Sequence, residues 1–348
     1  MDLTLRDLTD PYAGGHALQE MTARILGAVS ARWPADLVLD RGDRIVDVAD
    51  NYDRLGYTAD ARTRDARYTR YVSPDRMLRS QTSALIPPVL RRLAAAGRDS
   101  ALIACPGLVY RRDVIDRLHT GTPHQLDLWL LSPVPEDLSA WIATVVGAAL
   151  PGVAWRANPA SHPYTSDGVE IEACAQGRWV EIGECGRAAR PVLSGAGLPA
   201  YVCGLAMGLG LDRLVMLRKG IPDIRLLRSS DPRVAGQMLD LSPYRPVSSH
   251  PPARRDVSVA VRAGMTPEEM GDRVRSCLGP DAHLVEEVAV RSTTAPADLP
   301  GAARARLGIR PGEVNVLLRV VLRDLNGSIP VPAANHLRDR VHEALHHS

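Results

Sequence analysis

Four short apolar runs between residues 100 and 182 limit the fold of this chain more than any other feature. Each run is rich in β-branched residues or alternates apolar with polar residues, and each is bounded by Gly, Pro or Asp. This pattern is typical of strands in a mostly antiparallel sheet. The runs are Ser100–Ala104, Leu126–Leu131, Val169–Ala173 and Trp179–Ile182.

Three other stretches carry apolar residues at helical spacing. They are His16–Val29, Thr82–Ala95 and Gly204–Arg218. In the last of these, a glycine opens the predicted helix, and we place Leu205, Leu209 and Val215 on its inward face. Strands followed by a closing helix predict an α+β fold, with an antiparallel sheet flanked by helices.

A proline- and serine-rich stretch after Leu241 marks a boundary between two domains. We predict a first domain over residues 1–241, a linker over 242–250 and a second domain over 251–348. The elements predicted for the second domain are strand Val257–Val261, helix Pro267–Leu278, strand Leu284–Val290, a loop, strand Val314–Leu322 and helix Ala333–His346. The order β-α-β-β-α is that of a small ferredoxin-like domain, whose usual closing strand would lie beyond Ser348.

The bulk properties of the chain exclude several classes of protein. Its 45% apolar and 24% charged residues are the composition of a folded globular protein. No apolar run approaches the roughly 20 residues that span a bilayer, and the N-terminus lacks a basic segment followed by an apolar one. We therefore expect a cytoplasmic protein without membrane segments. The five cysteines show no C-x-x-C spacing, which argues against a disulfide framework or a zinc cluster.

Arg111 and Asp113 lie in a Tyr-Arg-Arg-Asp segment that suits a nucleoside triphosphate. The planar guanidinium of arginine forms two parallel charge-assisted hydrogen bonds with a phosphate and does not lose its charge. Asp113, two residues further on, could accept a hydrogen bond from the amino group of adenine. Taken alone, the segment is equally compatible with a surface ion pair.

A glycine-rich segment over residues 204–213 is a second candidate for ligand binding. It is not a dinucleotide fingerprint, because Arg213 stands where the third glycine belongs and no strand leads directly into it. Its glycines instead allow the backbone to approach a ligand closely, and Arg213 could stack on a base or hold a phosphate. By itself the segment predicts only a glycine-rich helix start.

Together, and in this order, these segments resemble the catalytic subunit of phenylalanyl-tRNA synthetases, which are class II aminoacyl-tRNA synthetases. The resemblance runs through most of residues 16–230. The segments similar to the family's motifs are His16–Leu18, Asn51–Asp53, Leu78–Ser83, Val109–Asp113 with Asp116 and His119, His124–Asp127, Trp179–Gly183 and Gly208–Arg225. From His250 onward the chain resembles the family's anticodon-binding domain, in an arrangement similar to that of the single-chain organellar enzymes.

The resemblance implies ATP-dependent activation of phenylalanine or a related aromatic amino acid as an aminoacyl-adenylate, with transfer to tRNA(Phe). ATP and Mg²⁺ are the implied cofactors. The ATP-binding residues implied are Arg111, Asp113, His119 and Arg213, of which Arg111, His119 and Arg213 are also the catalytic residues. The amino-acid site implied consists of Tyr71, Ser83, Gln125, Asp127, His162, Tyr164, Leu205 and Ala206. The magnesium ligands implied are Glu181 and Glu184, although either could instead support an arginine.

Several positions depart from the family's pattern. The departures are Ala17 for a proline, Gln81 for a histidine, Asp127 for a glutamate, Glu184 for a glycine, and His162 and Tyr164 for two phenylalanines. For His162 and Tyr164 two interpretations stay open. Their polar atoms either bind a hydroxylated or otherwise modified phenylalanine, or bond to protein partners and offer the substrate only ring surface.

Other end uses and assembly states also stay open. An adenylating paralogue could pass the amino acid to an acceptor other than tRNA, and a binding or regulatory paralogue would not catalyse at all. The resemblance allows either a homodimer through the helix over residues 16–29 or a monomer. The chain contains no phenylalanine. This absence fits either translation under scarce or mischarged phenylalanyl-tRNA, or codon bias.

Overall fold

The chain is described by a computed structural model over residues 3–175, 177–247 and 250–348. Of the predicted domains and linker, residues 1, 2, 176, 248 and 249 lie outside the described part. The chain divides into two compact units. The first consists of Met1–Arg111, Thr122–Ile221 and Gln237–Tyr244, and the second of Arg112–Gly121, Pro222–Gly236 and Arg245–Ser348.

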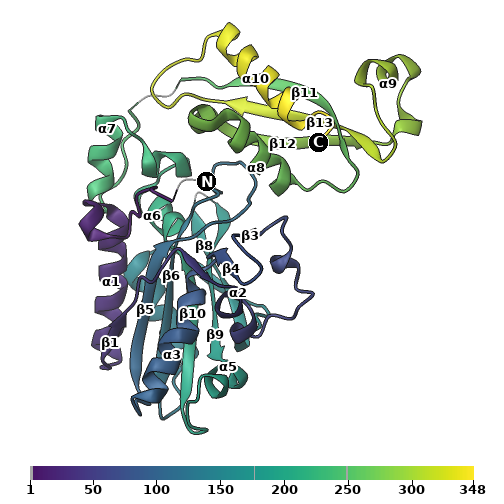
Figure 1. The fold of residues 1–348 in the computed structure, drawn as a ribbon. Coiled ribbons are helices and arrows are strands. Elements are labelled where there is room, and N and C mark those ends of the chain that lie inside the picture. Colours follow the sequence, from purple (N-terminus) through teal and green to yellow (C-terminus); the bar gives the residue numbers. More distant parts are fainter. Residues whose placement is uncertain (1–2, 176, 248–249) are drawn as a thin grey trace. The chain divides into compact units, whose positions relative to one another are not determined.

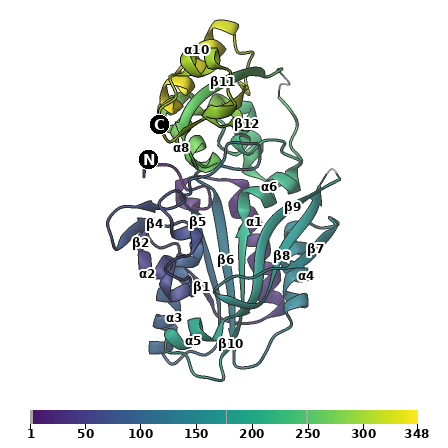
Figure 2. The ribbon, with the colours of Figure 1, turned by 90° about the vertical axis from the view of Figure 1, so that its right-hand side faces the viewer.

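The first unit is built on a seven-stranded sheet, which Figures 1 and 2 show from two sides. In spatial order its strands are β1 (Leu37–Leu39), β5 (Ala101–Leu108), β6 (His124–Ser132), β10 (Cys203–Gly210), β9 (Arg178–Ala188), β8 (Thr165–Ala175) and β7 (Trp155–Pro159). Neighbours run antiparallel except β1 and β5, which are parallel. The predicted α+β fold, with a mostly antiparallel sheet flanked by helices, is confirmed.

Helices cover the two faces of this sheet (Figure 2). On one face, α1 (Ala17–Arg32) packs against α4 (Leu138–Ala149) and α6 (Leu211–Lys219). On the other face, α3 (Ile86–Ala95) buries its apolar side chains against strands β5 and β6. The apolar spacing in the sequence predicts both α1 and α3, whereas it does not reveal α4.

The predicted helix over Gly204–Arg218 is wrong in its first half. Residues Cys203–Gly210 form β10, which lies between β6 and β9, and α6 begins only at Leu211. Gly and Ala at even positions alternate with Leu205, Met207 and Leu209, and a period of two residues is that of a strand. The small residues consequently share one face of the sheet with Asp127 and Trp129, and the large ones are buried on the opposite face.

A second sheet of the first unit holds a short polar segment in place. It is antiparallel and consists of β2 (Ile45–Asp47), β4 (Arg76–Leu78) and β3 (Arg70–Tyr71), in that order. Helix α2 (Val48–Asn51) follows β2, and the side chain of Asn51 bonds both the hydroxyl of Ser80 at 2.9 Å and its backbone N–H at 3.1 Å. Residues 80–83 are thereby fixed beside the large sheet.

The second unit contains a three-stranded antiparallel sheet in the order β11 (Ala253–Arg262), β13 (Glu313–Leu322) and β12 (Val285–Thr294). Helices α8 (Pro267–Leu278) and α10 (Val331–Leu345) share one apolar core with it. The described elements follow the predicted order β-α-β-β-α, but α9 (Gly301–Leu307) interrupts the segment predicted as a loop. After α10, the backbone N–H of His347 donates to the carbonyl of Ala260 at 2.7 Å, beside β11.

Two further segments belong to the second unit. One is Arg112–Gly121, and the other is Pro222–Gly236, which contains the 3-10 helix η5 (Ile224–Arg228) and α7 (Pro232–Ala235).

None of the described helices combines the length and the apolar character needed to cross a membrane.

Candidate active site

Asp127, Gly208 and Glu184 lie in register on three adjacent strands of the large sheet. Asp127 on β6 pairs with Gly208 on β10, which pairs in turn with Glu184 on β9. A Cβ atom placed on Gly208 would lie 3.8 Å from Oδ2 of Asp127, 3.7 Å from Cγ of Glu184 and 3.6 Å from the hydroxyl of Tyr164. These three side chains surround the space that glycine leaves open, and we call the arrangement the Gly208 site.

Asp127 is a buried carboxylate with several donors. Its Oδ2 accepts hydrogen bonds from the hydroxyls of Ser83 at 2.7 Å and Thr82 at 3.2 Å, and its Oδ1 accepts one from the indole of Trp129 at 3.0 Å. Burial nevertheless raises the pKa of Asp127 to about 6, and the charge of Glu184 adds to this effect. A cation bound beside Asp127 would favour its charged form.

Gln125 lies two residues before Asp127 on the same face of β6. Its Oε1 accepts a hydrogen bond from the backbone N–H of Thr82 at 3.2 Å. Thr82 and Ser83 belong to a single 3-10 turn, η4 (Thr82–Leu85), so this short segment supports both Gln125 and Asp127. The structure thus brings together three of the residues predicted for the amino-acid site, Ser83, Gln125 and Asp127.

Glu184 binds both His162 and Tyr164. Its Oε2 lies 2.6 Å from Nε2 of His162, and its Oε1 accepts a hydrogen bond from the hydroxyl of Tyr164. Burial opposes the charge of Glu184, but the hydrogen bond and the positive charge of His162 outweigh it and lower the pKa of this carboxyl. The hydrogen bond to Glu184 in turn raises the pKa of His162. Nε2 of His162 and the hydroxyl of Tyr164 thus contact a protein partner, Glu184 of the Gly208 site, whereas Nδ1 of His162 is buried without a hydrogen-bond partner among the described residues.

Tyr57 is held next to these groups by a glycine with a left-handed backbone. Gly56 has φ of 84°, and a Cβ there would lie only 2.9 Å from the carbonyl of Pro163, so the close approach requires glycine. The hydroxyl of Tyr57 donates to Oε1 of Gln81 at 3.3 Å. Burial and the charge of Glu184 raise the pKa of Tyr57.

Arg111 and Arg213, the two residues of the first unit that are predicted to bind ATP, are held by different hydrogen bonds. Nε of Arg111 donates to the carbonyl of Ser80 at 2.7 Å. Arg213 lies in the first turn of α6, where its Nη1 contacts the carbonyl and the carboxylate of Glu181 at 3.1 and 3.2 Å. The charge of Arg111 helps to lower the pKa of Glu184, which indicates that this arginine lies near the Gly208 site.

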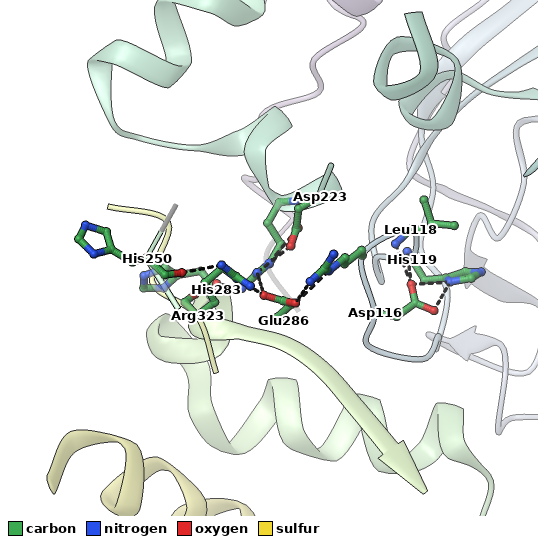
Figure 3. A network of polar contacts seen from close by, with 10 residues as sticks. Asp116, Leu118, His119, Asp223, His250, His283, Glu286 and Arg323 are labelled. Carbon is green, nitrogen blue, oxygen red and sulfur yellow. Dashed lines mark hydrogen bonds and ion pairs between the residues drawn. The ribbon is translucent and has the colours of Figure 1, made fainter. Parts of the chain in front are cut away.

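Asp113 and His119 belong to the second unit, in the segment Arg112–Gly121. Nδ1 of His119 lies 2.8 Å from both carboxylate oxygens of Asp116. Figure 3 shows the two side chains facing one another. Burial disfavours the charge of Asp116, but the hydrogen bonds from His119 and from the Leu118 backbone outweigh it and lower the pKa of Asp116. The imidazole of His119 thus has a fixed orientation.

The same segment is bonded to helix α8 and strand β12. Nη1 and Nη2 of Arg275 donate to the carbonyls of Asp113 and Val114, each at 2.6 Å. The backbone N–H of Val288 donates to the carbonyl of Ile115 at 2.9 Å, and Ile115 is buried in the apolar core of this unit. The backbone around Asp113 is therefore well supported.

Glu286 connects this segment to two others of the second unit (Figure 3). Glu286 is 2% exposed, and its carboxylate accepts hydrogen bonds from Nε and Nη2 of Arg117 at 2.9 and 2.5 Å. Arg323, which directly follows β13, donates to its other oxygen, and Nη2 of Arg225 lies 3.8 Å from that oxygen. Three arginines from separate parts of the chain thus meet at one buried carboxylate.

The structure places two further residues predicted for the amino-acid site on the small sheet and on the opposite face of β10. Tyr71 is 40% exposed on the small sheet, and its hydroxyl donates to the carbonyl of Arg64 at 2.6 Å. Leu205 is buried, but the alternation of β10 puts its side chain on the face opposite to Asp127. The resemblance implied Leu205 together with its neighbour Ala206, but the side chains of these two residues lie on opposite faces of β10, which corrects the prediction for Leu205. Ala206 does lie on the face of the Gly208 site.

The two predicted magnesium ligands are already occupied by protein partners. Each oxygen of Glu184 has one protein partner, and the charge of the carboxylate is already compensated by the imidazole of His162, which disfavours a bound metal ion there. Glu181 is half-exposed and paired with Arg213. Across the described residues, no group of three or more His, Cys, Asp and Glu side chains is placed to hold a metal ion. Any bound Mg²⁺ would therefore rely mainly on phosphate oxygens and water.

Sequence reasoning missed several residues of this site. Thr82 contacts Asp127 and supports Gln125, Trp129 donates to Asp127, and Tyr57 lies beside Glu184. Trp129 could have been found, because positions 125, 127 and 129 share one face of a predicted strand. No local sequence signal indicates Tyr57, which reaches the site through a loop.

Comparison with known proteins identifies the family to which this chain belongs. The family described as "tRNA synthetases class II core domain (F)" matches residues 16–238, which is more than half of the chain. The chain therefore belongs to the class II tRNA synthetase core family, of the phenylalanyl (F) type. Proteins of this family use ATP, generally with a divalent metal.

The relatives compared with this chain are named phenylalanine–tRNA ligase or its alpha subunit. A "Phenylalanine--tRNA ligase alpha subunit" of Synechocystis sp. is 29% identical over 244 residues, which cover 68% of this chain and 71% of that protein. The same subunit of Prochlorococcus marinus strain MIT 9313 is 33% identical over 190 residues, covering 54% and 56%. The chloroplastic/mitochondrial phenylalanine–tRNA ligase of Arabidopsis thaliana is 29% identical over 319 residues, covering 86% and 69%.

Proposed function

We propose that this chain activates phenylalanine or a related aromatic amino acid with ATP and transfers it to tRNA(Phe). It would thus be an aminoacyl-tRNA ligase that releases AMP. One observation carries the proposal: the buried carboxylate of Asp127, with the hydroxyls of Ser83 and Thr82 bonded to it, borders the open space above Gly208. Membership of the class II synthetase core family and the names of the relatives support it.

In this proposal, the α-ammonium group of the amino acid binds Asp127 and Gln125, with Ser83 beside them. An ammonium group has three donors and no acceptor, so it requires a cluster of oxygen acceptors. Its charge also compensates the ionised form of Asp127, which burial alone disfavours. The side chain of the amino acid then extends toward His162, Tyr164 and Ala206.

Activation needs positioning and charge stabilisation more than covalent help from the protein. A carboxylate oxygen of the amino acid attacks the α-phosphorus of ATP, and the bond from that phosphorus to the pyrophosphate oxygen breaks. We assign Arg111 to the α-phosphate, Asp113 to the adenine, and His119 and Arg213 to the outer phosphates. In the second step, a terminal ribose hydroxyl of tRNA attacks the acyl carbon and AMP leaves.

Mg²⁺ belongs to this proposal as a partner of the ATP phosphates. When bound, it would neutralise charge that develops on pyrophosphate. Of the two carboxylates predicted for it, Glu181 is the one we retain. The division of the chain into a catalytic domain over 1–241, a linker over 242–250 and a tRNA-binding domain over 251–348 is likewise part of the proposal.

The assembly state and location stay predictions. The apolar face of α1 is buried against α4 and α6, so a homodimer through α1 would have to use its polar face. Light scattering after size-exclusion chromatography would distinguish dimer from monomer. Cell fractionation would test the predicted cytoplasmic location.

The experiment that tests the function is amino-acid-dependent exchange between ATP and pyrophosphate. We expect exchange with at least one aromatic amino acid, and charging of tRNA(Phe) with the same amino acid. Asp127→Asn should reduce exchange at least a hundredfold, whereas Asp36→Asn, at a side chain that is 85% exposed, should not. Folded protein without exchange for any aromatic amino acid would contradict the proposal. Exchange without tRNA charging would instead favour another acceptor.

A further inference from the structure

We propose that the amino-acid site selects an aromatic ring that carries a hydrogen-bond donor, such as a hydroxyl or amino substituent, and that Glu184 accepts the hydrogen bond. The inference rests on the proposed function, because it requires the amino acid to bind at the Gly208 site. It names a substrate class for that site and a specificity-determining residue. His162 and Tyr164 are positioning residues in it, since they hold Glu184.

The first observation is where Glu184 points. Its Cγ and the Oδ2 of Asp127 both lie within 4 Å of the point where a Gly208 side chain would begin. The side chain of Glu184 is 30% exposed, while Tyr164 is 1% exposed beneath it. An amino acid held at Asp127 therefore extends over Gly208 toward an accessible carboxylate and not toward a purely apolar wall.

The second observation is the remaining capacity of this carboxylate. An ionised carboxylate can accept about four hydrogen bonds. Tyr164 occupies one position on Oε1 and His162 one on Oε2, and the described residues supply Glu184 with no further hydrogen bond. About two acceptor positions are left, on a group that stays charged because His162 stabilises its ionised form. They are available to a donor on the substrate.

The energetic consequence favours a polar ring. An unsubstituted phenyl ring would displace water from Glu184 and offer no hydrogen bond, which leaves a charged acceptor poorly solvated. A ring hydroxyl or amine replaces that water with a charge-assisted hydrogen bond. Sites built to bond a substrate group reject the analogue without it far more strongly than apolar sites reject an added group.

The architecture around Glu184 fixes its position. Gly183 brings β9 and β10 together, since a Cβ there would lie 2.3 Å from the carbonyl of Gly208. The rings of Tyr164 and Trp129 stack with centroids 6.1 Å apart, which holds the Tyr164 hydroxyl under the carboxylate. Glu184 is thus positioned by backbone and rings, so it can discriminate between substrates without rearranging.

The test compares kcat/KM for pyrophosphate exchange between phenylalanine and donor-bearing rings. The panel is ortho-, meta- and para-tyrosine and 4-aminophenylalanine. In the unmodified protein, we expect at least one of these to exceed phenylalanine tenfold. In Glu184→Gln and Glu184→Gly, this ratio should fall at least tenfold, with Gln retaining the size of the side chain in case Gly disturbs folding.

The matched control is Glu181→Gln, on the same strand and paired with Arg213. We expect it to raise the KM for ATP while leaving the ratio between the amino acids unaltered. A purely structural role for Glu184 would lower exchange with every amino acid equally. Equal losses of exchange with all the amino acids would overturn this inference and leave the proposed function standing. A preference of the unmodified protein for phenylalanine over the whole panel would do the same. Absence of exchange with any amino acid would overturn the proposed function and the inference with it.

Discussion

Asp212 accepts two hydrogen bonds from His124, one from its backbone N–H at 2.5 Å and one from Nδ1 of its imidazole at 2.9 Å. The other ring nitrogen of His124 accepts a hydrogen bond from the backbone N–H of Leu8 at 3.2 Å. Nε2 therefore carries no proton, and Nδ1 is the protonated nitrogen. The contact joins the first residue of β6 to the first turn of α6, and it fixes Arg213 relative to Asp127.

Removing this buried carboxylate should destabilise the first unit. Asp212→Ala leaves two donors of His124 without their acceptor inside the core, and we expect a loss of about 3 kcal/mol in the free energy of unfolding. Urea unfolding followed by circular dichroism measures it. Asp36→Ala, which removes an exposed ion pair with Arg98, is the control and should cost no more than about 0.5 kcal/mol. Equal effects of the two changes would show that the His124 contact contributes nothing special.

The raised pKa of Asp127 should make stability depend on pH. Burial raises this pKa from 3.8 to about 6 in the folded chain, so the folded state holds the proton more tightly than the unfolded state. The contribution to stability is therefore fully present below about pH 4 and is lost as the pH rises through 6. As the pH falls from 8 to 5, protonation of Asp127 should raise the free energy of unfolding by about 1 to 2 kcal/mol.

Asp127→Asn isolates that contribution, because an amide does not titrate in this range. The difference in unfolding free energy between the parent and the variant should change with pH by that amount, and a constant difference would contradict the assignment. The KM for the amino acid should move in the opposite sense. It should rise as the pH falls below 6, because a protonated Asp127 cannot compensate the charge of an ammonium group.

The sequence predicts the sheet better than it predicts the strand at its centre. The runs that become β5, β6, β8 and β9 alternate or are β-branched, and both properties are local. Residues 203–210 contain three glycines with no β-branched neighbour, so the same rules favour a helix start or a loop. Only the alternation of small residues with Leu205, Met207 and Leu209 indicates a strand, and its small face is needed because Asp127 and Glu184 flank it.

Those residues of the site that share one face of a strand can be predicted from the sequence. Contacts that depend on how strands far apart in the sequence pair with one another cannot. Gln125 and Asp127 follow from the motif that contains them. The contact of Glu184 with His162 and Tyr164 depends instead on the register of β8 against β9, which includes a bulge beside Gly183. The arginines around Glu286 illustrate the same limit, because Arg117 and Arg323 lie more than a hundred residues apart in the sequence.

Glu286 should be essential to the second unit. Glu286→Ala leaves Arg225 and Arg323, which are 14% and 24% exposed, beside one another without their shared anion. We expect a loss of about 3 to 5 kcal/mol in unfolding free energy and faster proteolysis within residues 112–121. Glu287→Ala changes the adjacent, half-buried residue and serves as the control. If the two variants unfold alike, the arginines do not depend on Glu286.

The pH dependence of this cluster has the opposite sign to that of Asp127. Burial disfavours the charge of Glu286, but the hydrogen bonds from Arg323 and Arg117 outweigh it and lower its pKa. Its contribution to stability is therefore present above the ordinary glutamate pKa and is lost as the pH falls through the lowered value. In Glu286→Gln, acid unfolding of the second unit should consequently begin from a lower stability and be less steep.

Lys219, the single lysine of the chain, should be inaccessible to amine reagents in the folded protein. Its side chain is fully buried, and its Nζ donates to the carbonyls of Asp240 at 2.8 Å and Ser242 at 2.5 Å. Burial also lowers the pKa of Lys219. These bonds tie residues 237–244 to the end of α6, so Lys219→Met should cost about 1 to 3 kcal/mol by leaving two carbonyls without a donor.

The labelling experiment is simple because there is one lysine to count. In native buffer, mass spectrometry after treatment with an amine-reactive ester should find Lys219 unmodified, and in denaturant it should find it modified. A short lysine-containing peptide added to both samples is the internal control, since it should react in both conditions. Rapid native labelling of Lys219 would mean that residues 237–244 detach from α6 on the timescale of the reaction, and the link between them would then be weaker than the geometry indicates.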